Sequence, residues 1–316
     1  MQAPVHTCFA GVDVAKLTLV VAMEGISVPV RTIENNARPI RAWLRALPEG
    51  CALAVEATGG YQDLLVQLAH AQGLAVYVLN PLDVHHYAKA CAVRGKTDRI
   101  DAQVIARYLQ REHGRLRAWQ PPSPRALQVQ ALLRERELIG TTIDALGQGL
   151  KVRGQAAIRA LQRAREKIDA ELLQIMRSEP ALSAGYERLQ TICGIGPLIG
   201  ACLADLFTER RFANADAAVA FSGLDPRPSD SGQSTGRRRL SKRGSRYLRR
   251  LLFLAAMAAR RSKVFAPTYL KLRQRGLHST EALVILARKI LRIAYSLWNS
   301  GQNFNPNLFN PACAKS

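Results

Sequence analysis

The chain has 316 residues, of which 48% are hydrophobic, so it can build the cores of two domains and is not a wholly disordered protein. Its net charge is +21, from 45 Lys and Arg against 24 Asp and Glu. Residues 1–114 hold 11 basic and 10 acidic side chains, whereas residues 115–316 hold 34 and 14. A basic surplus confined to the second part of the chain predicts a polyanionic partner there, although a basic surface also serves solubility alone.

Membrane insertion and secretion are not expected for this chain. It contains no apolar run of about 18 residues and no signal peptide. Its six cysteines, at positions 8, 51, 91, 193, 202 and 313, form no C-x-x-C pair and have no histidine at zinc-ligand spacing. They are typical of small core residues in a reducing compartment. We therefore expect a cytoplasmic protein without structural zinc.

The first 112 residues predict an α/β domain with a mixed sheet. Alternating apolar residues predict three strands joined by tight hairpins, the third over residues 26–34. Two helices are then expected at 37–46 and 61–72, and two strands at 51–56 and 74–79. The Asn80-Pro81 pair is expected to break the chain before short helices that run to about residue 112. Antiparallel strands followed by alternating strands and helices favour this fold class.

Three prolines within residues 119–124 mark the clearest boundary, because proline stops a helix. Apolar residues at three- and four-residue spacing then predict two long helices, either an antiparallel pair within the chain or a coiled coil between chains. The rest is expected to be mainly helical, with a Gly-x-Gly turn at 194–196 that is either a phosphate-binding hairpin or an ordinary tight turn. The predicted divisions are a catalytic domain at 1–118, a helical spacer at 125–180, a second domain at 186–302 and a loose tail at 303–316.

Four acidic residues stand where a carboxylate can bind a cation. Asp13 and Glu56 each end an apolar strand, and Asp98 and Asp101 lie three apart in the first turn of a predicted helix. A turn or capping role explains any one of them, since carboxylates are favourable at a helix N-terminus. Buried acids at strand ends nevertheless need a cation nearby, and a ligand set made only of oxygen suits Mg²⁺. Paired ions would serve phosphoryl transfer, so the acids predict a metal-dependent nuclease site.

The most basic stretch covers residues 227–263, with 12 Lys and Arg and a single acid, Asp230. A solvated loop that binds phosphate without chemistry accounts for this composition. Ser231 has arginines nearby that would neutralise charge at phosphorus during attack on a phosphodiester, but it has no obvious base. Ser229 and Ser234 are equally able to bind backbone, so the residues alone do not single out Ser231.

Taken together, these motifs resemble one family: the DEDD transposases of bacterial insertion sequences, which are bridge-RNA-guided recombinases related to Piv-type DNA invertases. The resemblance covers about residues 10–300. It rests on motifs in the same order: GVDVAK, EATGGY, Asn80-Pro81, KTDRIDA, GIGPLIGACL, FSGLDPRPSDSG and LSKRGSRYLRRLL. It implies a RuvC-like, RNase H-type fold for the N-terminal domain and a transposase domain in the second part of the chain.

The resemblance also implies the site and its partners. The Mg²⁺ ligands of the family match four residues: Asp13, Glu56, Asp98 and Asp101. Ser231 matches the serine that becomes covalently linked to DNA. In the family the active site combines the two domains from different protomers, and a noncoding RNA encoded by the element pairs with donor and target DNA. We expect a homo-oligomer, a dimer or tetramer, that acts at the bacterial nucleoid.

Nucleic acid is expected to contact seven basic residues: Arg237, Arg238, Arg239, Lys242, Arg243, Arg246 and Lys96. Because an RNA guide would read the sequence, the protein would need only to hold backbone and shape. Three other functions are compatible with these residues. They are a Piv-type invertase without a guide RNA, a RuvC-like nuclease or junction resolvase that uses water, and a nucleic-acid-binding protein whose acids are helix caps.

Overall fold

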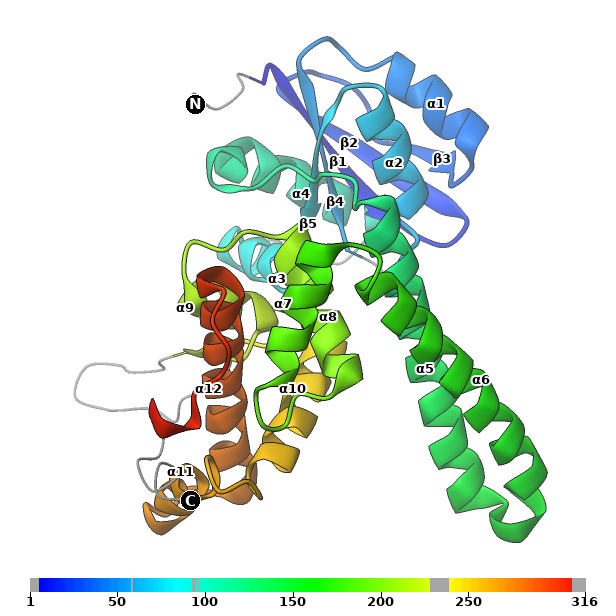
Figure 1. Ribbon diagram of the computed structural model, residues 1–316. Coiled ribbons are helices and arrows are strands. Elements are labelled where there is room, and N and C mark those ends of the chain that lie inside the picture. Colours follow the sequence, from blue (N-terminus) through cyan, green and yellow to red (C-terminus); the bar gives the residue numbers. More distant parts are fainter. Residues whose placement is uncertain (1–5, 58, 93–94, 96, 228–238, 309–316) are drawn as a thin grey trace. The chain divides into compact units, whose positions relative to one another are not determined.

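The computed structural model describes residues 6–57, 59–92, 95, 97–227 and 239–308. The chain divides into two compact units, residues 1–121 and 122–316, and the division falls within the proline-rich segment (Figure 1). In the described part of the chain, no helix is both long enough and apolar enough to span a membrane.

The first unit is built on a five-stranded sheet in the order β3-β2-β1-β4-β5. Its strands are β1 (Cys8–Val14), β2 (Thr18–Glu24), β3 (Arg31–Glu34), β4 (Cys51–Glu56) and β5 (Ala75–Leu79). β2 pairs antiparallel with β1 and β3, whereas β4 runs parallel to both β1 and β5. The predicted mixed α/β sheet is confirmed, and this arrangement is consistent with an RNase H-like fold.

Prolines shape two places in this unit, one where the prediction is wrong in detail and one where it is confirmed. Strand β3 begins at Arg31 rather than at residue 26, because Pro29 has no backbone N–H to donate to a ladder. The predicted break at Asn80-Pro81 is confirmed: β5 ends at Leu79, and helix α3 (Pro81–Ala90) begins at the proline. Asn80 Oδ1 accepts a hydrogen bond from Leu82 N at 2.9 Å, and proline suits the first helical position.

Helices cover both faces of the sheet. On one face, α1 (Ala37–Arg45) and α2 (Asp63–Ala71) bury apolar side chains such as Ile40 and Leu65 against the strands. On the other face, α3 and α4 (Asp98–Glu112) pack against the opposite side of the same strands, where Ile105 lies in one cluster with Ala54. The sheet is therefore the middle of three layers.

Helix α4 packs directly against the backbone of β1 at Gly11. A Cβ atom placed on Gly11 would lie 2.2 Å from Ala106 N and 2.3 Å from Ala102 O, far closer than van der Waals contact allows. Ala102 and Ala106 are one helical turn apart and fully buried. Three residues with little or no side chain thus set how closely α4 approaches the sheet.

The backbone that follows α4 covers the free edge of the sheet. β5 is the last strand on its side, and Trp119 N donates a hydrogen bond to Val76 O of that strand at 2.6 Å. The other outer strand, β3, is only four residues long and mostly exposed.

The second unit is mainly helical. It begins with two long helices, α5 (Pro124–Gly149) and α6 (Gln155–Met176), which are joined by a short 3₁₀ turn at Lys151–Gly154. The two helices pack side by side as a hairpin within the chain (Figure 1). The other helices of the unit are α7 (Pro180–Gln190), α8 (Pro197–Glu209), α9 (Ala215–Ser222), α10 (Arg246–Ala259), α11 (Ala266–Gln274) and α12 (Ser279–Ser300). A short strand pair, β6 (Pro226–Arg227) and β7 (Arg239–Leu240), accompanies them.

The core of this unit also explains two predicted features. Gly194, in the Gly-x-Gly turn, has a φ of 95°, and a Cβ there would lie 2.4 Å from Ala255 O of α10, so its packing alone requires glycine.

The predicted loose tail is not loose where the structure describes it. Phe304 is buried, and its N–H donates to Thr191 Oγ1 at 3.0 Å.

Replacing Gly11 with alanine tests the contact between α4 and β1. We expect Gly11→Ala to lower the free energy of unfolding by about 1–3 kcal/mol or more, because the new methyl group meets backbone that cannot move aside. Gly114→Ala is the matched control in the same unit, since a Cβ there meets nothing within 4 Å. Urea unfolding of the two variants and the parent would measure the difference. Equal stability of all three would show that α4 does not depend on Gly11.

Candidate active site

Asp13 and Glu56 occupy adjacent positions on neighbouring parallel strands. The register of β1 with β4 pairs Val12 with Val55, and the two acids are the next residue on each strand. Strands of one sheet lie about 4.8 Å apart, so the two carboxylates start from neighbouring points. Both residues are half-buried. Because side chains alternate along a strand, Asp13 projects from the same face as Gly11, the face that α4 covers.

The direction of α4 follows from its contacts along β1 and β2. Arg107 Nε donates to Glu24 Oε1 at 2.7 Å, and Glu24 lies where β2 pairs with the start of β1. Ala102 packs in one cluster with Val20, the register partner of Asp13. As residue numbers fall along α4, the helix therefore approaches the end of β1 that carries Asp13.

The first turn of α4 consequently lies at the edge of the sheet that carries Asp13 and Glu56. Thr97 is the N-cap residue just before this turn, and its side chain accepts a hydrogen bond from Ile100 N at 3.3 Å. Asp98 is exposed and Asp101 is half-buried, and the two project from one side of the helix. The backbone therefore places all four predicted acids at one edge, which we call the acidic edge.

The donor chemistry of the acidic edge fits Mg²⁺, since carboxylates are the hard oxygen ligands that this ion prefers. In the described part of the chain, no three His, Cys, Asp or Glu side chains stand in positions from which they could hold one metal ion. Joint binding of an ion by the acidic edge would therefore require side-chain rotations. Lys96, which precedes the first turn of α4, lies outside the described residues.

The serine-bearing segment falls in the second unit. Ser231, Arg237 and Arg238 lie outside the described residues, but both ends of their segment are described. β6 pairs antiparallel with β7, with Arg227 opposite Arg239, so the chain that leaves at one strand returns at the next.

Hydrogen bonds also join the residues just before β6 to those just after β7. Ser241 N donates to Asp225 O at 2.9 Å, and the Ser241 hydroxyl donates to the Asp225 carboxylate. Lys242 N donates to Gly223 O at 3.0 Å. The two chain segments thus stay joined from β6 and β7 to the end of α9.

Two glycines allow the segments to touch. A Cβ on Gly244 would lie 2.0 Å from Phe221 O, and a Cβ on Gly223 would lie 2.7 Å from the backbone N of Gly244. Gly223 also has a φ of 72°, which L side chains rarely adopt. No residue with a side chain would fit at either position without moving the backbone.

Arg249 closes this structure from α10. Its Nη1 donates to Ser222 O and Lys242 O, each at 3.3 Å, and also to Gly244 O. Burial, and then the neighbouring Arg246, lower the pKa of Arg249, but an arginine remains charged at neutral pH. We call Gly223, Asp225, Ser241, Gly244 and Arg249 the clasp.

The predicted nucleic-acid contacts that are described surround the clasp. Arg239, Lys242, Arg243 and Arg246 are all exposed. Lys242 has a φ of 53°, a left-handed conformation that costs a non-glycine residue about 1 kcal/mol. Arg246 stands in the first turn of α10, where a positive charge opposes the helix dipole. Cations held at such unfavourable positions are typical of a functional surface.

The sequence interpretation missed Arg249 and Asp225 as structural parts of this site. Arg249 lay within a run of arginines, and its spacing of three from Arg246 gave the only signal that it shares a helix face. Asp225 precedes Pro226 and carried no other signal in the sequence. Neither interaction could be inferred without the pairing of β6 with β7.

Comparison with known proteins places both units in one group. Residues 10–151 match the family model described as DEDD transposase IS110, and residues 186–270 match that of the transposase IS116/IS110/IS902 family. The pilin gene-inverting protein of Moraxella bovis is 28% identical over 318 residues, which cover 95% of this chain and 98% of that protein. The corresponding protein of Moraxella lacunata is 30% identical, over 81% of this chain and 82% of its own length.

An insertion-element protein also aligns along most of the chain. The uncharacterized 42 kDa protein of insertion element IS900 from Mycobacterium paratuberculosis is 23% identical, over 80% of this chain and 84% of its own length. Because family matches and relatives agree across both units, the chain belongs to the IS116/IS110/IS902 family of transposases and is a DNA recombinase.

Proposed function

We propose that this protein moves its own insertion element by cutting and rejoining DNA, with the acidic edge as a Mg²⁺ site, Ser231 as the nucleophile and a noncoding RNA as the guide. The observation that carries the proposal is that one chain holds two separately built sites. One unit gathers carboxylates at a sheet edge, and the other holds the ends of a serine-bearing basic segment in the clasp.

Asp13, Glu56, Asp98 and Asp101 would hold the metal. When bound, Mg²⁺ would help to activate the attacking oxygen and to neutralise charge on the departing one. The chain's own contribution is geometric. β1, β4 and α4 bring the four carboxylates to one edge, and the close contact at Gly11 fixes the distance between helix and strand.

Ser231 would form the covalent link to DNA. Its Oγ would bond to phosphorus as one sugar oxygen leaves, and the proton lost by the serine balances the proton gained by the departing sugar hydroxyl. Reaction of the linked phosphate with another sugar hydroxyl would release the serine and rejoin the strand. The arginines beside the clasp would neutralise the phosphate during both steps. The resemblance to the family supports a composite active site. In it, the acidic edge of one protomer and the serine of another would act together within a dimer or tetramer.

A second candidate is a DNA invertase that uses the same residues without a guide RNA. Two relatives that align with most of the chain are named pilin gene-inverting proteins, which favours this alternative. The alternatives differ in their need for RNA, so one assay separates them.

The acidic edge is tested by removing one charge without changing shape. We expect Asp13→Asn to slow strand cleavage by about 10³-fold while DNA affinity is retained, because an amide is a far weaker metal ligand than a carboxylate. Glu49→Gln is the matched control: it removes one exposed acid where the chain enters β4, at the opposite end of the sheet. Cleavage would be measured with Mg²⁺ and with EDTA. Unchanged cleavage by Asp13→Asn would remove the acidic edge from the mechanism.

The nucleophile is tested by trapping. Protein is incubated with labelled DNA, Mg²⁺ and RNA transcribed from the region flanking the gene, then denatured and examined for a protein–DNA adduct. We expect the adduct with the parent protein and with Ser229→Ala and Ser234→Ala, but not with Ser231→Ala. An adduct formed equally well without RNA would favour the invertase. Cleavage without any adduct, unaffected by Ser231→Ala, would indicate a nuclease that uses water.

The clasp is tested by shortening its cation. Lysine keeps the charge, but its ammonium group lies on a shorter and more flexible side chain than the planar guanidinium. It therefore does not reach the three carbonyl groups in the same geometry, and the ends of the serine-bearing segment lose their fixed separation. We expect Arg249→Lys to lower the rate of adduct formation by about 10²-fold, with little change in DNA affinity. Arg250→Lys is the control, because Arg250 is exposed and its Nη1 pairs with Glu137 Oε1 at 3.2 Å, away from the clasp. Equal rates for the two variants would contradict a positioning role.

A further inference from the structure

The outer face of α6 carries a row of basic side chains that the proposed function does not use. Arg159, Arg163 and Lys167 follow one another at four-residue spacing, so they lie about 6 Å apart along one side of the helix. All three are exposed. We call this row the α6 ridge.

The rest of this helix face is neutral. At about 100° per residue, the other positions of α6 within about 40° of Arg163 are Ala156, Ala170 and Gln174, and all of them are exposed. The face therefore presents cations separated by small or uncharged side chains and holds no acid. A solvated helix usually alternates charges of opposite sign instead.

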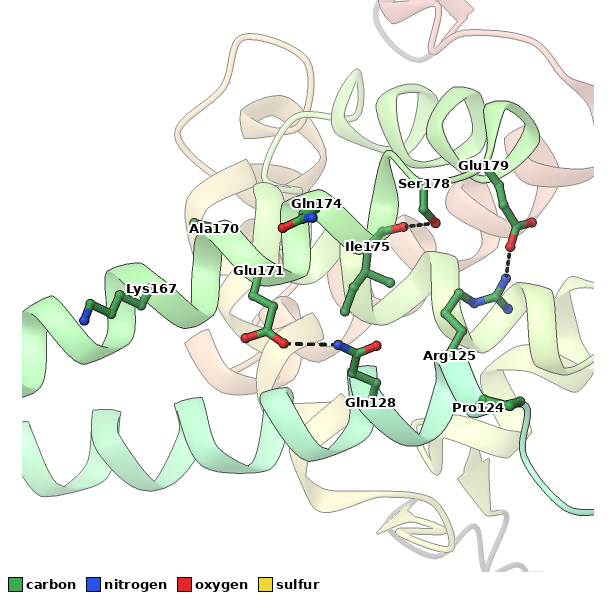
Figure 2. A pocket seen from close by; sticks show the side chains of 10 residues that line it. All are labelled: Pro124, Arg125, Gln128, Lys167, Ala170, Glu171, Gln174, Ile175, Ser178 and Glu179. Carbon is green, nitrogen blue, oxygen red and sulfur yellow. Dashed lines mark hydrogen bonds and ion pairs between the residues drawn. The ribbon is translucent and has the colours of Figure 1, made fainter.

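Two of the three acids of α6 are turned toward α5, whereas the third, Glu166, is exposed and follows Arg163 by three residues. Glu171, one turn after Lys167, accepts a hydrogen bond from Gln128 Nε2 at 3.1 Å, and Figure 2 shows this contact. Asp169 pairs with Arg136, also on α5. In the part of the chain that is described, no ion pair joins a cation of the α6 ridge to a carboxylate. The three cations of the ridge therefore have no ion-pair partner among the described residues, and Glu166 is the one acid of α6 that stands beside them without turning toward α5.

The charge pattern continues to the end of the hairpin. Residues 145–165 contain no Asp or Glu but include Lys151, Arg153 and Arg165 besides the first two ridge residues. Like charges one turn apart repel each other and disfavour the isolated helix. A partner with closely spaced negative charges would remove this repulsion, and duplex DNA carries one charge per about 1.7 Å of its axis.

We propose that the α6 ridge is a contact surface for the phosphate backbone of duplex DNA. The inference rests on the family's DNA recombinase activity but not on Ser231 or the acidic edge, because it concerns binding and not cleavage. The family matches end at residue 151 and resume at residue 186, so neither match extends over α6. Phosphate contacts carry no sequence information, so a duplex of arbitrary sequence is a valid probe.

The test compares two variants that lose the same charge in different places. The ridge variant is Arg159→Gln with Arg163→Gln and Lys167→Gln. The control variant is Lys271→Gln with Arg275→Gln and Lys289→Gln. These three cations are exposed and lie in α11, directly after α11 and in α12. Affinity for a fluorescent DNA duplex would be measured in EDTA at several salt concentrations, and for an RNA duplex of the same sequence alongside it.

We expect the ridge variant to lower the slope of log affinity against log salt by about 2 to 3, because each phosphate contact contributes about 0.9. The control variant should change the slope by less than about 1. Equal slopes for the two variants would mean that only total charge matters and would overturn the proposal. A loss confined to the RNA duplex would overturn it as well.

A third variant separates charge from folding. Arg159→Lys with Arg163→Lys keeps the charge of the ridge and should keep the slope of the parent. If it lost the slope while its helix content was unchanged, charge on the ridge would not be the cause of binding. Because none of these measurements involves strand cleavage, failure of the ridge and failure of the catalytic proposal give different results.

Discussion

The absence of a side chain at Gly11, where the backbone of α4 meets β1, is the constraint on which the first unit depends. Gly11 faces Ala102 and Ala106, and a shift of α4 by one turn would place Asp98 or Gln110 where an alanine now lies. Neither of these side chains would fit under the helix. The contact therefore fixes the register of α4 along the strand as well as its depth, and with it the position of the first turn beside Asp13.

The clasp in the second unit also depends on close backbone contact at glycine. Gly223 and Gly244 let two chain segments meet backbone to backbone, and Arg249 satisfies three carbonyl groups that the close approach would otherwise leave without donors. Close backbone contact at both places suits the proposed function, because phosphoryl transfer depends on groups held within about 0.5 Å of their working geometry. Under that proposal, side-chain rotations would complete each site when substrate and metal bind.

Much of the first unit could be predicted because its signals are local. Strand ends at Asp13 and Glu56 follow from alternating apolar residues, and the start of α4 follows from the capping role of Thr97. The meeting of α4 with β1 was not predictable in this way. It depends on Gly11, which lies more than 90 positions before Ala102 and Ala106 in the sequence, and nothing local marks the three small residues as partners.

The clasp shows the same limit. The basic composition around Ser231 was visible, but Arg249 and Asp225 gain their roles only through the pairing of β6 with β7. The wrong detail of the first unit arose differently. A strand was predicted through Pro29, whereas this proline cannot donate to the ladder and β3 begins only at Arg31.

The hydrogen bond from Trp119 to Val76 has a consequence for how copies of the protein behave toward one another. An outer strand with unpaired carbonyl groups can recruit a strand from a second molecule and begin aggregation. The charged and very short β3 discourages this on one side of the sheet, and the segment that ends at Trp119 does so on the other. A first unit cut from the chain before Trp119 would lose that cover, although every strand and helix of the sheet domain would still be present.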